Sequence, residues 1–203
     1  MRKIAWSLIT ILLALLFTGI GTLANFTHAE ASQSSMPTAG RPDLRLVTDK
    51  SAVYAFQFSN VVPGSSGNSR NRLINADNQS GQLGVYFSEV TNTPGTTGEY
   101  ADNNGDLGAK VEIAVYIDLD MSGSWNSGDI GLKSNGTIYY NPTALDYTAL
   151  NGYGGVKWDV MTMLASAEVH VIIMWRIPIT VGNEIQGDSA SFDITFELRA
   201  SDT

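Results

Sequence analysis

The sequence predicts an all-β protein, a jelly-roll-type β-sandwich preceded by a signal helix and an extended arm. Two observations predict this fold. Short apolar runs alternate with polar residues at a period of two, the repeat of a strand with one buried face. Clusters of Gly, Pro and Asn separate these runs and are typical of turns.

The first 24 residues are not expected to belong to this fold. Met1-Arg2-Lys3 is a basic start, and the apolar run over residues 4–23 completes the pattern of a secretory signal peptide. Cleavage fits either after Ala24 or after Ala31. An uncleaved anchor is the competing interpretation, because a bilayer span needs about 20 apolar residues. We expect a secreted protein, extracellular or at the cell surface, that meets a membrane only through this segment before cleavage.

Residues 25–42 are predicted to be an extended N-terminal arm. The segment is rich in Ser, Ala, Thr, Gln and Pro, and its only large apolar side chains are Phe26 and Met36. It cannot bury enough apolar surface to fold alone. The arm is therefore either a flexible tether or a strand that another molecule orders.

The sandwich domain is expected to cover residues 43–203. Strands are predicted over the apolar runs at 44–47, 52–58, 83–90, 111–117, 137–140, 169–179 and 190–198. Residues 169–173 are apolar almost throughout, which favours a strand covered on both faces. Only two segments, 143–150 and 158–167, could pass for short helices.

Charge and cysteine content exclude several function classes. Twelve basic against twenty acidic residues give a formal net charge of −8, so a nucleic-acid partner is excluded. Removal of Arg2 and Lys3 with the signal peptide would leave a mature charge of −10. The absence of cysteine excludes disulfides, thiolate metal sites and a cysteine nucleophile. Stability must come from a packed core or from assembly.

The sharpest local motif is the acidic loop at residues 118–129. Carboxylates at its first and third positions, a hydroxyl at the fifth, Gly at the sixth and an acid at the twelfth follow the template of a calcium loop. The predicted ligands are Asp118, Asp120, Ser122, the Ser124 carbonyl, Asn126 and Asp129. Asp129 replaces the usual Glu, and a strand rather than a helix precedes the loop. An acidic hairpin without metal is therefore the alternative.

Three stretches are similar to patterns of one known family. The first is G-T-L-A-N-F-T-H-A-E-A-S at residues 21–32, with His28 where Asp is usual. The second covers residues 38–46 and 58–64, with Ser65 in place of an acidic residue. The third is W-R-I-P, then G-N-E-I-Q-G-D-S, and the final strand. Together they resemble the camelysin/TasA-type family of secreted biofilm-matrix fibre proteins, which depend on a dedicated signal peptidase.

The resemblance implies a jelly-roll fold, cleavage after Ala24 and a role as a filament subunit in which the mature N-terminal segment supplies a strand to the next subunit. The physics of sheets agrees, because an unpaired sheet edge accepts another strand. We expect the chain to polymerise with itself. The residues expected to enter a neighbour's groove are Phe26, Ala29, Ala31 and Met36.

Two other functions compete with a filament subunit. A calcium-stabilised adhesion or carbohydrate-binding module would use tryptophans and tyrosines to bind a polysaccharide of the matrix. A metallopeptidase is implied by the camelysin name alone. The chain has only His28 and His170, no H-E-x-x-H motif, and no third ligand beside the Glu168–His170 pair. We therefore expect no enzyme, and we expect His170 to be a strand residue near a sheet edge.

Overall fold

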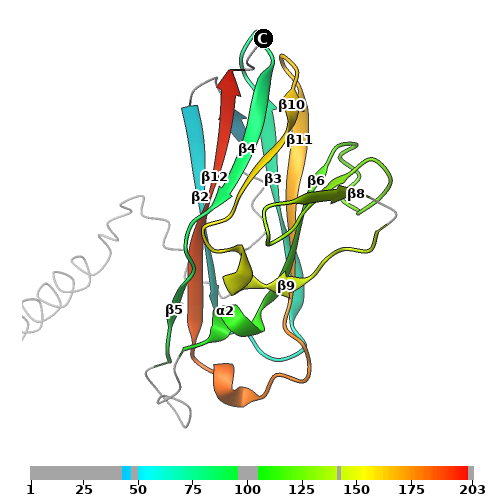
Figure 1. Ribbon diagram of the computed structural model, residues 1–203. Coiled ribbons are helices and arrows are strands. Elements are labelled where there is room, and N and C mark those ends of the chain that lie inside the picture. Colours follow the sequence, from blue (N-terminus) through cyan, green and yellow to red (C-terminus); the bar gives the residue numbers. More distant parts are fainter. Residues whose placement is uncertain (1–42, 47–49, 96–104, 141–142, 201–203) are drawn as a thin grey trace, which may run out of the picture. The chain divides into compact units, whose positions relative to one another are not determined.

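The computed structural model describes residues 43–46, 50–95, 105–140 and 143–200 (Figure 1). The expected signal peptide, both cleavage sites, the arm and its donor residues Phe26, Ala29, Ala31 and Met36 lie outside the described residues. Within the described ranges, no helix has the length and apolar character needed to span a bilayer.

The described chain is built almost entirely from strands. The strands are β1 (Asp43–Leu46), β2 (Lys50–Ser59), β3 (Ser66–Asn75), β4 (Gly81–Phe87), β5 (Thr91–Thr93), β6 (Glu112–Asp118), β7 (Ile130–Leu132), β8 (Ile138–Tyr140), β9 (Thr148–Ala149), β10 (Lys157–Met163), β11 (Glu168–Arg176) and β12 (Ser189–Ala200). Three short helical turns connect them: α2 (Leu107–Lys110), η1 (Leu150–Tyr153) and η2 (Asn183–Ile185).

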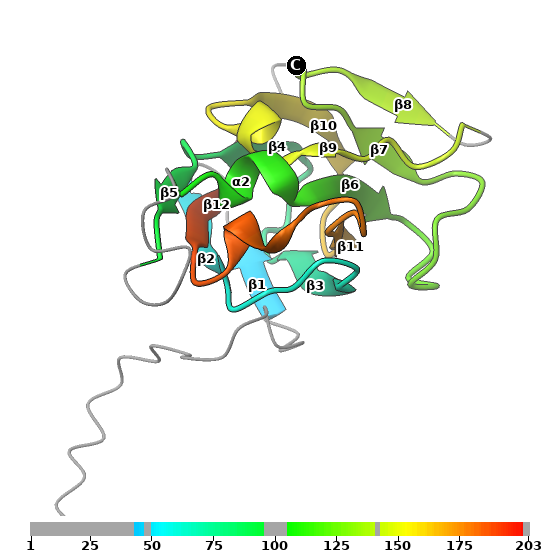
Figure 2. The same cartoon turned by 90° about the horizontal axis from the view of Figure 1, so that it is seen from below.

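Two sheets pack against each other (Figures 1 and 2). The first sheet has the order β1-β3-β11-β6-β7-β8, with β9 also paired to β6, and the second has the order β10-β4-β12-β2, with β5 paired to β12. Successive long strands alternate between the sheets, which is how a jelly roll wraps. The predicted all-β sandwich is confirmed.

The core lies between the sheets and is largely aromatic at its centre. Phe192 of β12 stacks on Phe56 of β2 and Phe87 of β4, with ring centroids 5.1 and 5.3 Å apart. Phe58 packs edge-on against Trp175 of β11 at 5.6 Å, which joins one sheet to the other. Strand β12 follows the predicted alternation, since its buried side chains are two residues apart.

The expectation for β11 is also confirmed. Residues 169–173 are all buried, although adjacent side chains point to opposite faces. Val171 faces the core, whereas Ile172 lies on the outer face, where its cross-strand neighbours are Arg70 and Tyr116. The outer face of this sheet is therefore covered near its centre, because side chains and loops of the same sheet fold over it.

Both helix expectations are wrong. Residues 158–163 lie in β10, where Trp158 and Val160 are buried and a bulge follows Asp159. Beyond the bulge the next buried residue is Met163, three residues after Val160. A spacing of three between buried residues resembles that of a helix. In the other segment only Leu150 is helical, as the first residue of η1, and Thr148–Ala149 is a short strand on β6.

Strand β3 has no apolar pattern that would have predicted it. Its inward-facing side chains include Ser69, Asn71 and Asn75, all of them buried. It becomes a strand because it pairs with β11 in unbroken register from Ser66 to Ile74. Pairing with a neighbour, rather than local propensity, fixes this element.

Candidate functional site

The acidic loop connects β6 to β7, and strand pairing brings its two ends together. Asp118 ends β6 and Asp129 directly precedes β7, while Ile117 and Ile130 are cross-strand partners. Asp118 and Asp129 are buried, whereas Asp120 is exposed. One carboxylate oxygen from each of the three lies within 4.8 Å of the others.

Backbone geometry folds the loop tightly around these groups. Met121, Gly123 and Gly128 have positive φ angles of 58°, 80° and 105°. Gly123 occupies the position where the motif requires glycine. A Cβ there would lie 1.8 Å from the Arg70 guanidinium, so the loop and β3 approach each other closely at this point.

Main-chain amides hold the two buried carboxylates. Ser122 and Gly123 donate their N–H groups to Asp118, at 3.1 and 2.8 Å. Leu119 and Asn126 donate theirs to Asp129, at 3.2 and 2.8 Å. These bonds fix the carboxylates relative to the loop backbone and leave the remaining oxygen lone pairs available to a ligand.

The side-chain amide of Asn126 lies among the remaining predicted ligands. Its Nδ2 is 2.8 Å from Ser122 Oγ, 3.1 Å from the Ser124 carbonyl oxygen and 3.1 Å from Asp120 Oδ2. Two amide hydrogens cannot serve three acceptors well. Rotation of the amide would replace Nδ2 with Oδ1 and produce a cluster of oxygen atoms only. The structure brings the six predicted residues together, and after such a rotation each would offer an oxygen donor of the kind calcium prefers.

The electrostatics of the loop are those of crowded negative charge. Burial raises the pKa of Asp118, although the Gly123 amide opposes the shift. The Ser122 amide lowers the pKa of exposed Asp120. Burial, followed by the charges of Asp118 and Asp129, raises the pKa of Tyr116 to about 12. A bound cation would relieve this repulsion.

Trp125 attaches the loop to the outer face of the first sheet. Its ring contacts Tyr116 edge-on at 5.5 Å and Tyr139 at 5.4 Å, and its Nε1 donates to the Thr143 carbonyl at 2.8 Å. A sugar-binding face would use tryptophans and tyrosines such as Trp125, Tyr139 and Tyr140. Trp125 and Tyr139 pack on each other, whereas Tyr140 is 54% exposed.

His170 does not lie near a sheet edge, so that expectation is wrong. It belongs to β11, which pairs on both sides, and it is the cross-strand partner of Asp118. Its Nδ1 is 3.8 Å from Asp118 and its Nε2 is 3.8 Å from Glu168. Arg72 forms an ion pair with Glu168. The sequence missed the contact with Asp118 because it joins residues on different strands.

A second feature is the edge of β3. Strand β1 pairs with β3 in parallel, but only from Arg72 to Asn75. Asn75 N–H donates to the Ala167 carbonyl beside β11, and Ala76 N–H donates to the Leu46 carbonyl of β1. Even-numbered residues of β3 therefore direct their backbone groups away from β11. Among the described residues, none pairs with this side between Ser66 and Asn71.

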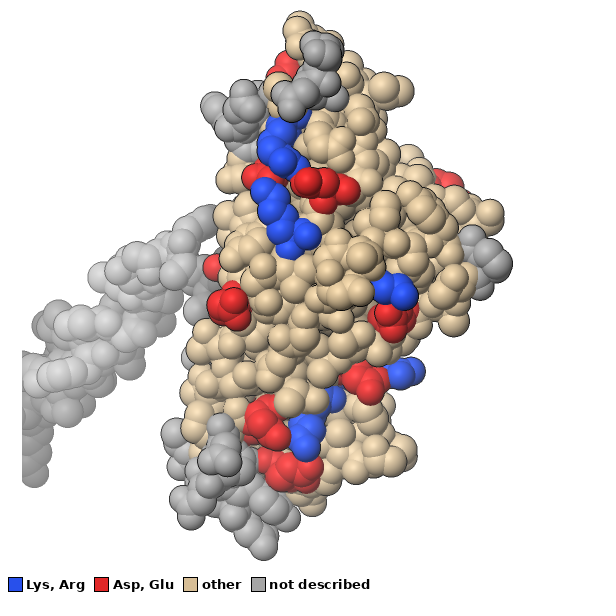
Figure 3. Space-filling view, viewed as in Figure 1, with Lys and Arg blue, Asp and Glu red and all other residues tan. Residues whose placement is uncertain are grey.

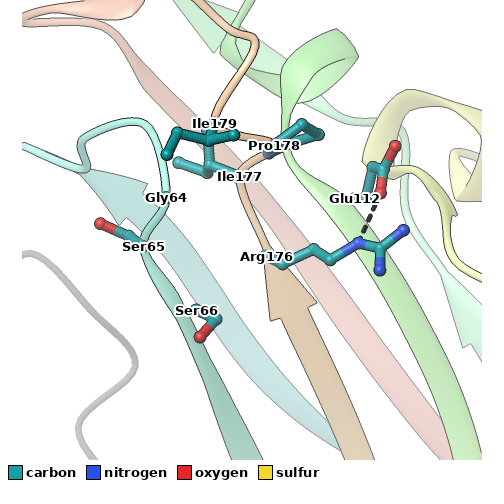
Figure 4. Close-up of a pocket in the computed structure, with 8 residues that line it drawn as sticks. All are labelled: Gly64, Ser65, Ser66, Glu112, Arg176, Ile177, Pro178 and Ile179. Carbon is teal, nitrogen blue, oxygen red and sulfur yellow. Dashed lines mark hydrogen bonds and ion pairs between the residues drawn. The ribbon is translucent and has the colours of Figure 1, made fainter.

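A shallow pocket lies at the start of this edge (Figure 4). It is lined by Gly64, Ser65, Ser66, Glu112, Arg176, Ile177, Pro178 and Ile179. Arg176 Nε donates to Glu112 at 2.7 Å, so the two charged groups of the pocket neutralise each other. Ile179 is 84% exposed. The pocket offers hydroxyls and an apolar side chain directly beside Ser66.

Charges elsewhere are mixed. In Figure 3, basic and acidic side chains lie next to each other on the visible face of the described chain. Arg199 pairs with Asp159 and Glu197, and Lys157 also pairs with Glu197. This distribution gives the visible face no extended basic patch of the kind that a polyanion would need.

No protein-family model matches the chain, and no curated protein does. Among solved structures, the chain is similar to Salmonella Typhimurium PliG, a periplasmic inhibitor of g-type lysozyme, at 12% identity over 79% of this chain and 100% of that one, with a TM-score of 0.30. A mutant of Escherichia coli PliG matches at 7% identity over the same shares, with a TM-score of 0.28. Both TM-scores are too low to demonstrate a common fold.

Proposed function

We propose that the mature chain is a secreted structural subunit that polymerises by donor-strand exchange into extracellular filaments of a biofilm matrix. The observation that carries this proposal is the edge of β3 between Ser66 and Asn71, where β1 stops short and no other described strand pairs. The export signal and the resemblance to camelysin/TasA-type proteins support the same function.

An unpaired edge and a separate strand-forming arm give a directional contact. Backbone N–H and C=O groups on an open edge bind an added strand through main-chain hydrogen bonds. The arm at residues 25–42 could extend roughly 60 Å, at about 3.3 Å per residue. Because donor and acceptor are different surfaces, each subunit keeps one of each free, and the contact propagates as a filament.

Deletion of residues 25–40 from the mature chain tests this function. The full mature chain should form filaments visible by negative-stain microscopy, and the deleted chain should stay monomeric by sedimentation. Circular dichroism should show the same β spectrum for both chains, because the sandwich begins at residue 43. A chain with the same arm residues in scrambled order is the matched control for length and composition.

Two outcomes would overturn the proposal. The first is filaments that persist after the deletion, since the arm would then not be the donor. The second is a full mature chain that remains monomeric at every concentration and ionic condition in which it is soluble.

We further propose that the acidic loop binds calcium and stiffens the outer face on which Trp125 packs. The same loop supports the alternative function, a calcium-stabilised cell-surface adhesion or carbohydrate-binding module, because aromatic side chains adjoin it. That alternative predicts that the monomeric chain binds a matrix polysaccharide and that Asp118→Ala abolishes this binding. A monomeric chain that binds no matrix polysaccharide would exclude it.

A further inference from the structure

Asn71 of β3 is a buried polar side chain. It is 0% exposed, and neither its Nδ2 nor its Oδ1 has a hydrogen-bond partner among the residues that the structure describes. Buried amides are almost always satisfied, since the desolvated group otherwise weakens the fold. On the side of β11 its cross-strand neighbour is Val171, which is apolar and offers no side-chain partner. The unpaired edge lies on its other side.

The other inward-facing residues of this edge, Gly67 and Ser69, leave little room for the side chains of an added strand. The indole of Trp175 covers Gly67, where an added Cβ would lie 2.7 Å from the ring. Ser69 is 2% exposed. A strand placed beside β3 would set its inward side chains about 5 Å from these residues. Such a strand must carry small residues opposite Gly67 and Ser69 and a hydrogen-bonding residue opposite Asn71.

The chain's own residues directly before β1 do not fit this edge. In the register of β1, position 42 would lie opposite Asn71, and its N–H would point toward the Arg70 carbonyl. Position 42 is proline and has no N–H. Direct extension of β1 would therefore leave the Arg70 carbonyl unpaired.

One face of the arm has the required residues. Ala29, Ala31 and Gln33 alternate with His28, Glu30 and Ser32. An extended strand would place the first set on one face and the second, more polar set on the other. With Gln33 opposite Asn71, the two alanines fall opposite Ser69 and Gly67. In such a strand, two of the four predicted donor residues, Ala29 and Ala31, would share this face, and the other two, Phe26 and Met36, would lie on the opposite one.

We propose that Asn71 selects the incoming strand, by pairing its side-chain amide with the amide of Gln33 from a second copy of the chain. Each amide supplies one donor and one acceptor, so a single pair satisfies both atoms of Asn71. The strand runs parallel to β3, with residues 28–33 along residues 66–71. This inference rests on the proposed function and deepens it, because it names the residues that make the contact specific.

The experiment measures the critical concentration for filament formation by sedimentation of the mature full-length chain. Asn71→Leu and Gln33→Leu should each raise it by roughly tenfold or more, because each leaves one buried amide unpaired. The double variant should return to within a few fold of the unmodified chain, since two leucines pack together. Thr27→Val, which lies just outside the paired segment 28–33, should leave the critical concentration unchanged.

Mixing the two single variants tests whether the contact joins different copies. In an alternating copolymer, each junction contains either Gln33 with Asn71 or two leucines. An equimolar mixture should therefore assemble near the critical concentration of the unmodified chain, although neither variant does so alone.

Thermal unfolding of monomeric Asn71→Leu provides a separate measurement. Its melting temperature should be no lower than that of the unmodified chain, because the substitution removes an unsatisfied amide.

The outcomes separate this inference from the proposed function. If the unmodified chain never assembles, both fail. If it assembles and the Asn71 and Gln33 variants assemble equally well, only the selection by Asn71 fails. The pairing would be overturned if Thr27→Val changed the critical concentration and Gln33→Leu did not. It would also be overturned if an equimolar mixture of the two single variants failed to assemble near the critical concentration of the unmodified chain.

Discussion

At the residue scale, Gly131 of β7 shows how one position supports the acidic loop. Its cross-strand partner is Tyr139, whose ring lies over it, and an added Cβ would sit 2.2 Å from that ring. Gly131→Ala should destabilise the protein by about 1–3 kcal/mol, because the displaced ring also carries Trp125. Chemical denaturation measures the change. Gly152→Ala, whose Cβ would meet Thr148 at 3.3 Å, is the milder control.

The calcium proposal predicts a second effect at single residues. Calcium should raise the unfolding free energy of the full chain, by about 2.7 kcal/mol at one hundred times the dissociation constant. Asp120→Asn should remove most of this gain, because it deletes one ligand charge from an exposed position. Asp193→Asn, an exposed carboxylate in β12, should keep it. Equal calcium responses in the two variants, measured by thermal unfolding, would contradict the site.

The same gain should depend on pH. Calcium binds the ionised carboxylates, and burial raises the pKa of Asp118, so protons compete there at a higher pH than at an ordinary aspartate. The stabilisation by calcium should be largest near neutral pH. It should decrease as the pH falls through the raised pKa of Asp118. Chemical unfolding with and without calcium, repeated from neutral to acidic pH, measures the increase in unfolding free energy that calcium causes. An increase that does not depend on pH would argue against Asp118 as a ligand.

At the scale of the element, β3 pairs with β11 along one side, whereas on its other side no described residue pairs with it between Ser66 and Asn71. The N–H of Asn68 faces the open side, because the even-numbered residues direct their backbone groups away from β11. Asn68→Pro should therefore block strand addition without breaking a β3–β11 hydrogen bond. Filament formation should be lost while the monomer melts within a few degrees of the unmodified chain. Asn68→Thr keeps the N–H and should assemble normally.

At the scale of the whole molecule, net charge opposes assembly. The chain has a formal net charge of −8, which would become −10 on loss of the expected signal peptide, and this charge repels other copies. Salt screens that repulsion, since the Debye length falls from about 30 Å at 0.01 M to about 3 Å at 1 M. Filament growth, followed by light scattering, should be faster at high than at low sodium chloride. Slower growth in salt would mean that attractive charge pairs hold the subunits together.

The sequence predicted the elements whose signal is local. Strand β12 alternates apolar and polar side chains, and the acidic loop carries its ligand types at fixed spacing, so both could be read from neighbouring residues. Residues 158–163 resemble a helix in sequence because a bulge in β10 changes the spacing of the buried residues. A bulge depends on the partner strand, which a local pattern does not contain.

What the sequence by itself determined is the period-two pattern, and hence the all-β sandwich, together with the residues of the acidic loop. Only the tertiary structure decided that β3 is a strand, that Asn71 is buried with no hydrogen-bond partner in the described part of the chain, and that His170 lies against Asp118. The physical reason is that burial and strand pairing join residues far apart in the chain, and cross-strand contacts leave no repeat in the sequence.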